Sequence, residues 1–204
     1  MKHRENPSAL RPTARSIGVP LSSSQVASLE AFEGLIRERA IPAGLVAEAD
    51  ADRVRTRHVL DCLRAAVAVG DRDREAYDLG SGAGLPGIVV AIARPTLSVG
   101  LVESRARRAG FLEFAVERLG LVNARVLRGR IEDVAEPADV CFARALAALP
   151  RAWELAEPLL RVGGRLVYFA GQGAHVPDQL AGRTVDVVSS PVLERAGPLV
   201  IMAR

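Results

Sequence analysis

The feature that most constrains this chain is a glycine-rich loop at residues 77–87, between two apolar stretches. Glycine stands at every second position, as Gly80, Gly82 and Gly84, and an apolar helix is predicted just after a proline. Without Cβ atoms, this backbone can turn sharply and press against a ligand. An ordinary strand-to-helix turn would also use glycines. Asp78 before the loop and Glu103 at the end of the next strand favour a nucleoside-cofactor loop.

Two nucleoside cofactors compete for this loop, a dinucleotide and S-adenosylmethionine. In the dinucleotide fingerprint the third glycine follows the second by three residues, and the helix N-terminus faces a pyrophosphate. Here Gly84 follows Gly82 by two residues, a spacing typical of class I methyltransferases, and the amino group of the methyl donor suits Asp78. Glu103, nineteen residues after Gly84, can accept hydrogen bonds from the ribose hydroxyls of either cofactor. The glycine spacing therefore favours S-adenosylmethionine.

Length and composition fit one sizeable domain with a small helical extension. The chain has 204 residues, of which 49% are hydrophobic, and no apolar run approaches the ~20 residues of a membrane span. No secretory signal is recognised, so we expect a cytoplasmic protein. Cys62 and Cys141 match no metal spacing, and we expect two small buried residues and no metal. A net charge of +3 permits a nucleic-acid partner without requiring one.

The N-terminal part is expected to hold a tail and a helical extension. Residues 1–20 contain prolines and arginines without an apolar period, and they predict a flexible basic arm. The extension is assigned to residues 21–72. Ser22 and Gln25 form a capping box, so its first helix is predicted at about 23–39.

A second helix of the extension is expected to follow a cap at Asp50 or Asp52. One of its faces carries small and apolar residues together with His58. A histidine at such a place is more often an ordinary helix residue with satisfied hydrogen bonds than a catalyst. His58 is therefore not assigned a catalytic role.

Residues 73–204 alternate between strand and helix patterns. The predicted strands are at about 75–79, 98–103, 124–128, 138–143, 164–170, 183–188 and 198–203. The predicted helices are at about 86–94, 105–119, 131–135 and 148–161. This alternation indicates an α/β domain with a mainly parallel seven-stranded sheet covered on both faces. The link between the last two strands is too short for a crossover helix, so these strands should be antiparallel.

Several stretches of the domain together match a known family. The glycine loop with Leu85-Pro86-Gly87 is the most specific of them. The others are 91–95, 108–112, 119–121, 130–132, 143–145, 158–160 and 163–166. Upstream, Arg57 to Leu63 is similar to an Arg-His-x-x-Asp-Ser-Leu helix. Residues 57–204 closely resemble the bacterial small-subunit ribosomal RNA guanine-N7 methyltransferases, also called glucose-inhibited division protein B.

The resemblance implies a class I S-adenosylmethionine-dependent methyltransferase with a Rossmann-like fold, acting on ribosomal RNA or the small ribosomal subunit. It implies that Gly80 and Leu85 contact the cofactor, and that Ile131 and Glu132 line the adenine pocket. It also implies that Arg144, predicted to lie just after the fourth strand, stands between cofactor and substrate. We expect Arg144 to be the residue most needed for turnover, in an orienting role, while a salt bridge in a polar rim is the alternative.

Two departures from the family pattern lie on the presumed substrate side. Residues 37–46 replace the usual Trp-Asn and Asn-Leu-Thr stretches, and Ala170-Gly171 replaces the usual Lys-Gly after the fifth strand. The cofactor side keeps its pattern. Binding of the methyl donor is thus the better supported of the two expectations.

The leading hypothesis is methyl transfer to guanine N7 in small-subunit ribosomal RNA. N7 carries a lone pair and no proton, so alignment and exclusion of water suffice without a general base. Arginines are expected to hold RNA phosphates, although solvated helix faces would look the same. The candidates are Arg53, Arg55, Arg57, Arg105, Arg107 and Arg108. Methylation of another RNA or a small molecule, and a non-catalytic cofactor-binding regulator, remain as alternatives.

Overall fold

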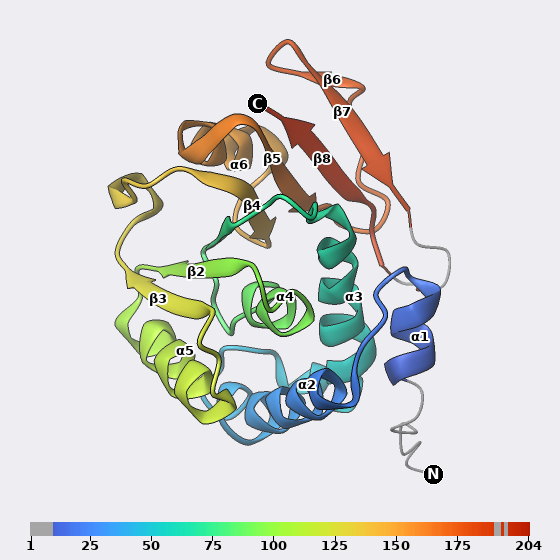
Figure 1. The fold of residues 1–204 in the computed structure, drawn as a ribbon, viewed down its shortest axis with the longest axis vertical. Coiled ribbons are helices and arrows are strands. Elements are labelled where there is room, and N and C mark those ends of the chain that lie inside the picture. The colour runs from blue at the N-terminus through green and yellow to red at the C-terminus, as the bar shows by residue number, and fades with distance from the viewer. Residues whose placement is uncertain (1–9, 190–192, 194–195) are drawn as a thin grey trace.

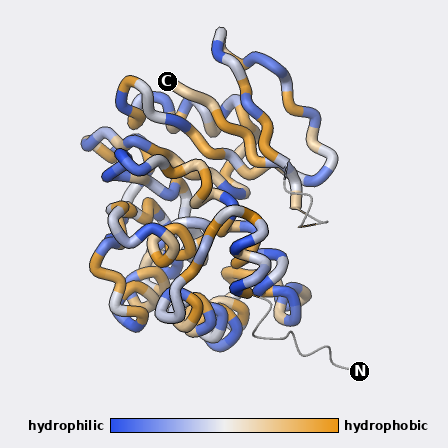
Figure 2. The backbone as a smooth tube through the Cα atoms, turned by 45° about the vertical axis from the view of Figure 1, so that its right-hand side comes forward, coloured by the Kyte–Doolittle hydropathy of each residue, from blue (hydrophilic) through white to orange (hydrophobic). Residues whose placement is uncertain are grey.

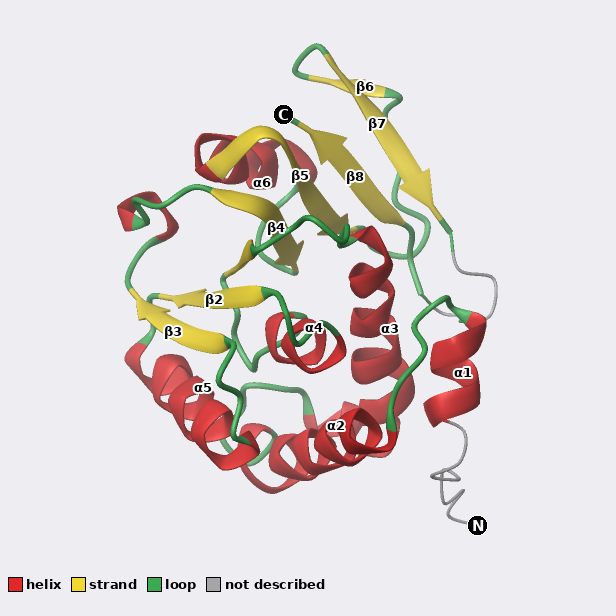
Figure 3. Ribbon diagram, in the orientation of Figure 1, coloured by secondary structure: helices red, strands yellow, loops and turns green. Residues whose placement is uncertain are grey.

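A computed structural model describes residues 10–189, 193 and 196–204. These residues form a mixed sheet of eight strands in the order β3-β2-β1-β4-β5-β8-β7-β6 (Figures 1 and 3). The strands are β1 Glu75–Leu79, β2 Ser98–Glu103, β3 Ala124–Arg128, β4 Ala138–Arg144, β5 Leu160–Phe169, β6 Gln179–Leu180, β7 Arg183–Val188 and β8 Leu199–Ala203. The first five are parallel, whereas β8 is antiparallel to both β5 and β7. The predicted α/β class and the antiparallel pairing of the last two long strands are confirmed.

The strand order places one crevice in the sheet. From β1 the chain proceeds to β2 and β3 on one side, and it returns to β4 and β5 on the other side. The loops after β1 and β4 therefore separate at the carboxyl edge, where open α/β sheets bind ligands. Two of the predicted site segments, the glycine loop and Arg144, lie at this switch point.

Two hydrophobic cores fill the two faces of the sheet. One face packs against α4 Gly87–Ala93, α5 Ala106–Leu119 and the N-terminal helices. The other face packs against α6 Leu149–Ala156, whose Trp153 is fully buried. In Figure 2 hydrophobic residues, in orange, recur along the chain and alternate with hydrophilic residues, in blue. Helix α4 is buried in all seven residues, because β2, α2 and α3 surround it in the middle of Figure 1.

Two boundaries in the second half of the chain differ from the prediction. The helix predicted at 148–161 ends at Ala156 and continues as a 3-10 turn over Glu157–Leu159, because Pro158 lacks the N–H that a helix interior needs. Strand β5 consequently begins at Leu160 and not near 164, and the glycine pair 163–164 lies inside the strand at a register shift. The short strand β6 was not predicted. The helix predicted at 131–135 is a 3-10 turn over Ile131–Asp133.

The N-terminal helices cap one side of the domain. Helix α1, Leu10–Ser16, lies within the segment predicted as a flexible arm, and that prediction is wrong for these residues because Leu10 and Ala14 are fully buried. Residues 1–9 lie outside the described part. Helix α2, Ser23–Leu35, begins at the predicted capping box and continues as a π-helix over Ile36–Ala40.

The second predicted helix is a continuous helical segment of mixed type. It comprises a 3-10 stretch Glu48–Arg53, a π-helix Val54–Val59, α3 Leu60–Leu63 and a 3-10 stretch Arg64–Ala68. Gln25 of the capping box also donates to the carbonyls of Ile92 and Ala93 at 3.0 and 3.1 Å, which fastens α2 to the end of α4. The division of the chain between residues 72 and 73 stays a prediction.

Candidate active site

The glycine loop joins β1 to α4 and turns through backbone conformations that favour glycine. Gly80, Gly82 and Gly84 have φ values of 71°, 58° and 82°. The amides of Gly80 and Ser81 both donate to the carbonyl of Val102 at 3.0 Å, so the loop is held against β2. A Cβ added to Gly82 would meet nothing closer than 3.8 Å. The middle of the loop thus borders open space, and the loop fits a bound nucleoside cofactor.

The side chain of Asp78, just before the glycine loop, binds the first residue of the helix that follows the loop. Its side chain is 1% exposed, and its Oδ2 accepts a hydrogen bond from the amide of Gly87 at 2.9 Å. Burial raises the pKa of this carboxyl group to about 6, although the Gly87 amide partly offsets the effect. Oδ2 is thus directed to the first residue of α4, and Asp78 is buried, so the structure shows no contact of Asp78 with the open side of the loop among the described residues. The predicted contact with a cofactor amino group stays a prediction.

Glu103 connects the end of β2 to the glycine loop, as the predicted site requires. Its Oε2 accepts from the amide of Gly82 at 3.0 Å, and its Oε1 accepts from the amide of Arg105 at 2.9 Å. The side chain is nearly buried, and the guanidinium of Arg108 lies 3.9 Å away. A carboxylate accepts about four hydrogen bonds, so Glu103 retains sites for two hydroxyl donors.

The remaining predicted cofactor residues lie along the same edge. Leu85 is buried and precedes a cis peptide bond to Pro86. Ile131 is buried in the 3-10 turn that follows β3, whereas Glu132 is exposed and lies within 4 Å of the guanidinium groups of Arg130 and Arg151. Ile131 can therefore supply an apolar wall, and Glu132 can supply backbone groups.

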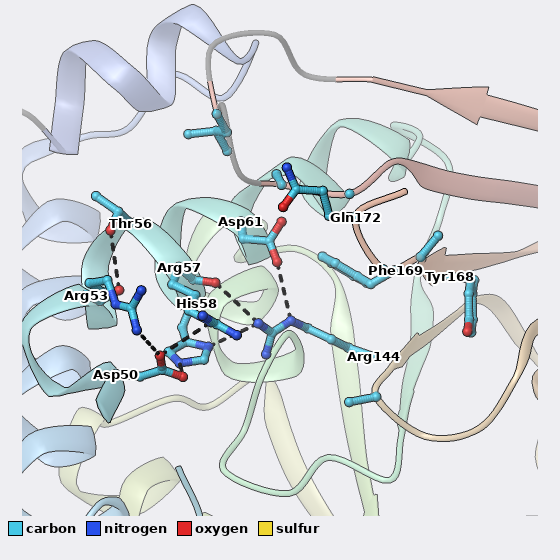
Figure 4. Close-up of a pocket in the computed structure, with 16 residues that line it drawn as sticks. Asp50, Arg53, Thr56, Arg57, His58, Asp61, Arg144, Tyr168, Phe169 and Gln172 are labelled. Carbon is cyan, nitrogen blue, oxygen red and sulfur yellow. Dashed lines mark hydrogen bonds and ion pairs between the residues drawn. The ribbon is translucent and has the colours of Figure 1, made fainter. Parts of the chain in front are cut away.

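Arg144 ends β4, and its guanidinium is held by the N-terminal helical segment (Figure 4). Its Nη2 donates to Nδ1 of His58 at 3.0 Å and to the carbonyl of Arg57 at 3.3 Å. Its Nε lies 3.4 Å from Oδ2 of Asp61. The next residue, Ala145, has a φ of 53°, a left-handed conformation that is uncommon for a residue with a Cβ and is often found at functional sites.

His58 lies between Asp50 and Arg144 and is satisfied at both ring nitrogens. Nε2 is 3.1 Å from Oδ2 of Asp50, and Nδ1 accepts from Arg144. Burial and the positive charge of Arg144 lower the pKa of His58 despite the opposing effect of Asp50. A neutral ring that donates from Nε2 and accepts at Nδ1 fits both contacts. His58 is therefore a satisfied helix histidine, as expected, but it also positions Arg144.

A cavity of about 1010 Å³ opens beside this network. Residues from four parts of the chain line it, and Figure 4 shows Asp61 and Arg144 directed toward one another in its wall. The lining residues include Asp50, Arg53, Arg57, His58, Asp61, Arg144, Tyr168, Phe169, Ala170 and Gln172. Arg144 and Ala145 line the cavity at the start of the loop after β4, and Leu146 of the same loop lies against Gly80, since a Cβ on Gly80 would be 2.8 Å from Leu146 Cδ1.

One of the arginines proposed for RNA is assigned wrongly. Arg55 is 8% exposed, and its Nε and Nη2 donate to the buried carboxylate of Glu33. It joins the π-helix to α2 and has no access to a phosphate. Arg57, Arg105 and Arg107 are exposed, and Arg53 and Arg108 are partly exposed.

No helix among residues 10–189, 193 and 196–204 has the length and apolar character that crossing a membrane requires. In the same part of the chain, no group of three or more histidine, cysteine, aspartate or glutamate side chains is arranged to hold a metal ion.

Comparison with known proteins identifies the family. Residues 25–193 match the family model described as rRNA small subunit methyltransferase G. The chain belongs to the rRNA small subunit methyltransferase G family. Ribosomal RNA small subunit methyltransferase G of Acidiphilium cryptum is 43% identical over 80% of this chain and 76% of its own length. The protein of the same name from Roseiflexus is 36% identical over 94% of this chain and 88% of its own length.

Solved structures with low sequence identity share the fold. The O-methyltransferase TomG from Streptomyces achromogenes, in complex with SAM, has a TM-score of 0.61 at 17% identity, covering 99% of this chain and 97% of its own. A SAM-dependent methyltransferase from Aquifex aeolicus has a TM-score of 0.54 at 16% identity, covering 79% and 97%. The class I methyltransferase fold expected for the rRNA small subunit methyltransferase G family is thus confirmed.

In this member of the rRNA small subunit methyltransferase G family, sequence reasoning missed the side chains that hold Arg144. Asp50, His58 and Asp61 all line the cavity, yet the sequence indicated only a helix cap at Asp50 and an ordinary helix residue at His58. The available signal was the Arg57 to Leu63 stretch, which contains two of them. Of the two departures from the family pattern, Ala170 lines the cavity and no residue of 37–46 is among its described lining residues.

Proposed function

We propose that this chain transfers a methyl group from S-adenosylmethionine to N7 of a guanine in small-subunit ribosomal RNA. The observation that carries the proposal is the junction of two sites at the switch point of the sheet. The glycine loop and Glu103 form one side, and the loop after Arg144 contacts Gly80 from the side of the large cavity. This arrangement suits a cofactor and a base that meet beside Arg144.

Methyl transfer to N7 requires the protein mainly to orient the guanine and the cofactor. S-adenosylmethionine, when bound, supplies an electrophilic methyl carbon on a positively charged sulfur. The guanine N7 has a lone pair and carries no proton, so the protein need not remove one. The residues of this chain bind, align and exclude water. Glu103 and the glycine loop hold the nucleoside, Ile131 offers an apolar wall, and the cavity encloses the base.

Arg144 acts in this proposal as an orienting residue. Positive charge develops on the guanine during transfer, so a guanidinium is a poor direct stabiliser of that charge. Its planar set of donors is well suited to fix a carbonyl oxygen. His58 and Asp61 hold the guanidinium from two directions, which restricts its rotation before a substrate arrives.

RNA phosphates are assigned in this proposal to exposed arginines at the edge of the site. Arg53 and Arg57 line the cavity, and Arg105 and Arg107 lie at the start of α5 beside Glu103. In the described part of the chain, Arg105 and Arg107 make no ion pair with a carboxylate. Their charges therefore remain available to a polyanion. A ribosomal RNA substrate would also place the enzyme in the cytoplasm.

The proposal is tested by methyl transfer with labelled S-adenosylmethionine to isolated small ribosomal subunits, naked ribosomal RNA, transfer RNA and a metabolite extract. Mass spectrometry of the digested RNA should reveal 7-methylguanosine from the ribosomal substrates. If the labelled methyl group is found only in transfer RNA or in metabolites, the substrate belongs to another class. Binding of the cofactor without transfer to any of them would favour a non-catalytic regulator.

A further inference from the structure

The carboxylate of Asp61 holds Arg144 and also faces the cavity. Asp61 lines the cavity beside Arg144, with its Oδ2 3.4 Å from the arginine Nε. We propose that Asp61 recognises the Watson–Crick edge of the target guanine by accepting from N1–H and the N2 amino group, while Arg144 donates to O6. This inference rests on the proposed function and names the residue that selects guanine.

The order of groups on the base matches the order of side chains in the cavity. Around its edge, guanine presents N7, O6, N1–H and the N2 amino group in sequence, two acceptors followed by two donors. Arg144 ends β4, two residues before the Leu146 that lies against Gly80 of the cofactor loop, and Asp61 lies beside Arg144 in the cavity wall. With N7 toward the methyl group, O6 meets the arginine and the two donors meet the carboxylate. Adenine presents an amino group and an unprotonated N1 there, so it would oppose both contacts.

Asp61 has the free acceptor capacity that this role requires. An ionised carboxylate offers about four acceptor sites. Oδ1 accepts from Nη2 of the buried Arg64, and Oδ2 has the longer contact with Arg144. Arg144 likewise has a donor to spare, because its Nη1 makes no hydrogen bond with any described residue. Arg64, 3% exposed, holds the carboxylate from the protein side, so its other lone pairs can face a ligand.

The second carboxylate in the cavity is already occupied. Oδ1 of Asp50 lies 3.2 Å from Arg53 and 3.4 Å from Arg57, and Oδ2 accepts from His58. Those three contacts assign Asp50 to holding the histidine that positions Arg144. Asp61 is therefore the better candidate for contact with the base.

A carboxylate at this edge also fits the change of charge during transfer. The bond from N7 to the methyl carbon forms as the methyl–sulfur bond breaks, and the bonding pair stays on sulfur. The positive charge passes to the guanine ring, and no proton leaves. The N1–H and N2 amino donors become more acidic, so their hydrogen bonds to Asp61 strengthen in the transition state. Asp61 would stabilise the charge that Arg144 cannot.

The experiment replaces the target guanine by inosine, which lacks only the N2 amino group. The target position is first mapped as 7-methylguanosine, and small-subunit RNA is then assembled with guanosine or inosine at that position. Wild-type enzyme should show a kcat/KM lower by about tenfold for inosine, within the range for losing part of a bidentate contact. The Asp61→Ala variant should be slower on guanosine and should discriminate less than about twofold between the two bases.

Controls separate recognition from folding. Asp73→Ala removes a carboxylate of similar burial that pairs with Arg165 outside the cavity, and it should retain the tenfold discrimination. Calorimetry should give the same S-adenosylmethionine affinity for Asp61→Ala as for wild type, which shows that the fold is intact. Asp61→Ala removes the partner of the buried Arg64. If this variant does not fold, the comparison of guanosine with inosine by the wild-type enzyme still tests the inference.

The outcomes distinguish this inference from the proposed function. Equal wild-type rates on guanosine and inosine, or undiminished discrimination in Asp61→Ala, overturn the role of Asp61 while methyl transfer to guanosine stands. Wild-type enzyme that methylates neither RNA at N7, although it binds the cofactor, overturns the proposed function itself. The inference is supported if Asp61→Ala loses the discrimination between guanosine and inosine while wild type and Asp73→Ala keep it.

Discussion

The cofactor side and the cavity side of this site are built in different ways. On the cofactor side, backbone amides and carbonyls make most of the contacts, and a single side chain, Glu103, joins the loop to β2. On the cavity side, the contacts run between side chains that are far apart in the chain, as in the bond between Arg144 and His58 across 86 positions. One side is a local backbone motif, and the other is a product of tertiary packing.

This difference explains which part of the site tolerates change. A backbone loop with positive φ values depends on glycine at fixed positions, because other residues adopt those conformations at a cost. A network of charged side chains depends on geometry, and several residue types can preserve its charge while losing its shape. Substitutions on the two sides of the site should therefore have separable effects on cofactor binding and on turnover.

Replacing Gly82 by aspartate should remove measurable binding of S-adenosylmethionine. The new side chain would enter the open space beside the loop and add a negative charge near Glu103. Aspartate tolerates the left-handed conformation better than most residues, so the protein should remain folded. Isothermal calorimetry measures the affinity and circular dichroism checks the fold. Unchanged affinity in folded protein would contradict the cofactor site.

Replacing Arg144 by lysine should reduce kcat on the order of 10²-fold, because the planar donor geometry is lost although the charge remains. Cofactor affinity should stay near the wild-type value, which would confine the effect to the cavity side. Arg161→Lys is the matched control, since Arg161 is exposed and pairs with Asp139 away from the cavity. Wild-type rates for both Arg144→Lys and Arg144→Ala would make Arg144 part of a polar rim only.

Replacing Glu103 by alanine should weaken cofactor binding by about 1–3 kcal/mol, as expected for lost hydrogen bonds to a charged acceptor. Part of the loss would come from the Gly82 amide, which loses its partner. Glu103→Gln keeps one acceptor oxygen, so comparing its loss of affinity with that of Glu103→Ala separates the contribution of the Gly82 amide. Calorimetry with an analogue lacking both ribose hydroxyls completes the test, because an equal loss for both ligands would show that Glu103 does not hold the ribose.

The smallest effect concerns the pH dependence conferred by His58. Its pKa is lowered from 6.5 in the folded protein by burial and Arg144, with Arg57 adding to the effect and Asp50 opposing it. Between that lowered pKa and 6.5, the unfolded chain binds more protons, so the free energy of unfolding should fall as the pH drops through this window. Above 6.5 the contribution is fully present.

The measurement compares urea unfolding of wild type and His58→Gln between pH 5 and pH 8. The buried Asp78, whose pKa is raised to about 6, titrates in both proteins, so its contribution cancels in the difference. The difference between the two free energies should shrink at low pH. A difference that is independent of pH would show that His58 does not titrate in this way.

The parallel core of the fold could be predicted from the sequence because alternating strand and helix patterns leave few topologies. The predicted boundaries of helices and strands were wrong where the chemistry of individual residues overrode the alternating pattern. Pro158 ended a helix early, and the glycine pair at 163–164 belonged to a strand with a register shift. Helix α1 was missed because its burial depends on other helices and its seven residues carry only two buried side chains.

The sequence predicted the parts of the site that short motifs form better than the parts that tertiary packing brings together. The glycine spacing and Glu103 indicated the cofactor loop, and the structure brings Glu103 to Gly82. The positions of Asp50, His58 and Asp61 could not be inferred in the same way, because a helix carries such residues on solvated faces just as readily. Arg55 shows the converse, since its burial against Glu33 follows from packing that no short motif records.

The burial of α4 on every side has a consequence for the integrity of the protein. Most helices that cover a sheet keep one polar face toward water. Helix α4 has none, because the N-terminal helices form a third layer over it, and Gln25 binds the carbonyls at its end. A fragment starting at residue 73 would expose an apolar helix and aggregate. The extension and the methyltransferase domain should therefore melt in one cooperative transition, and any shortened version has to keep both.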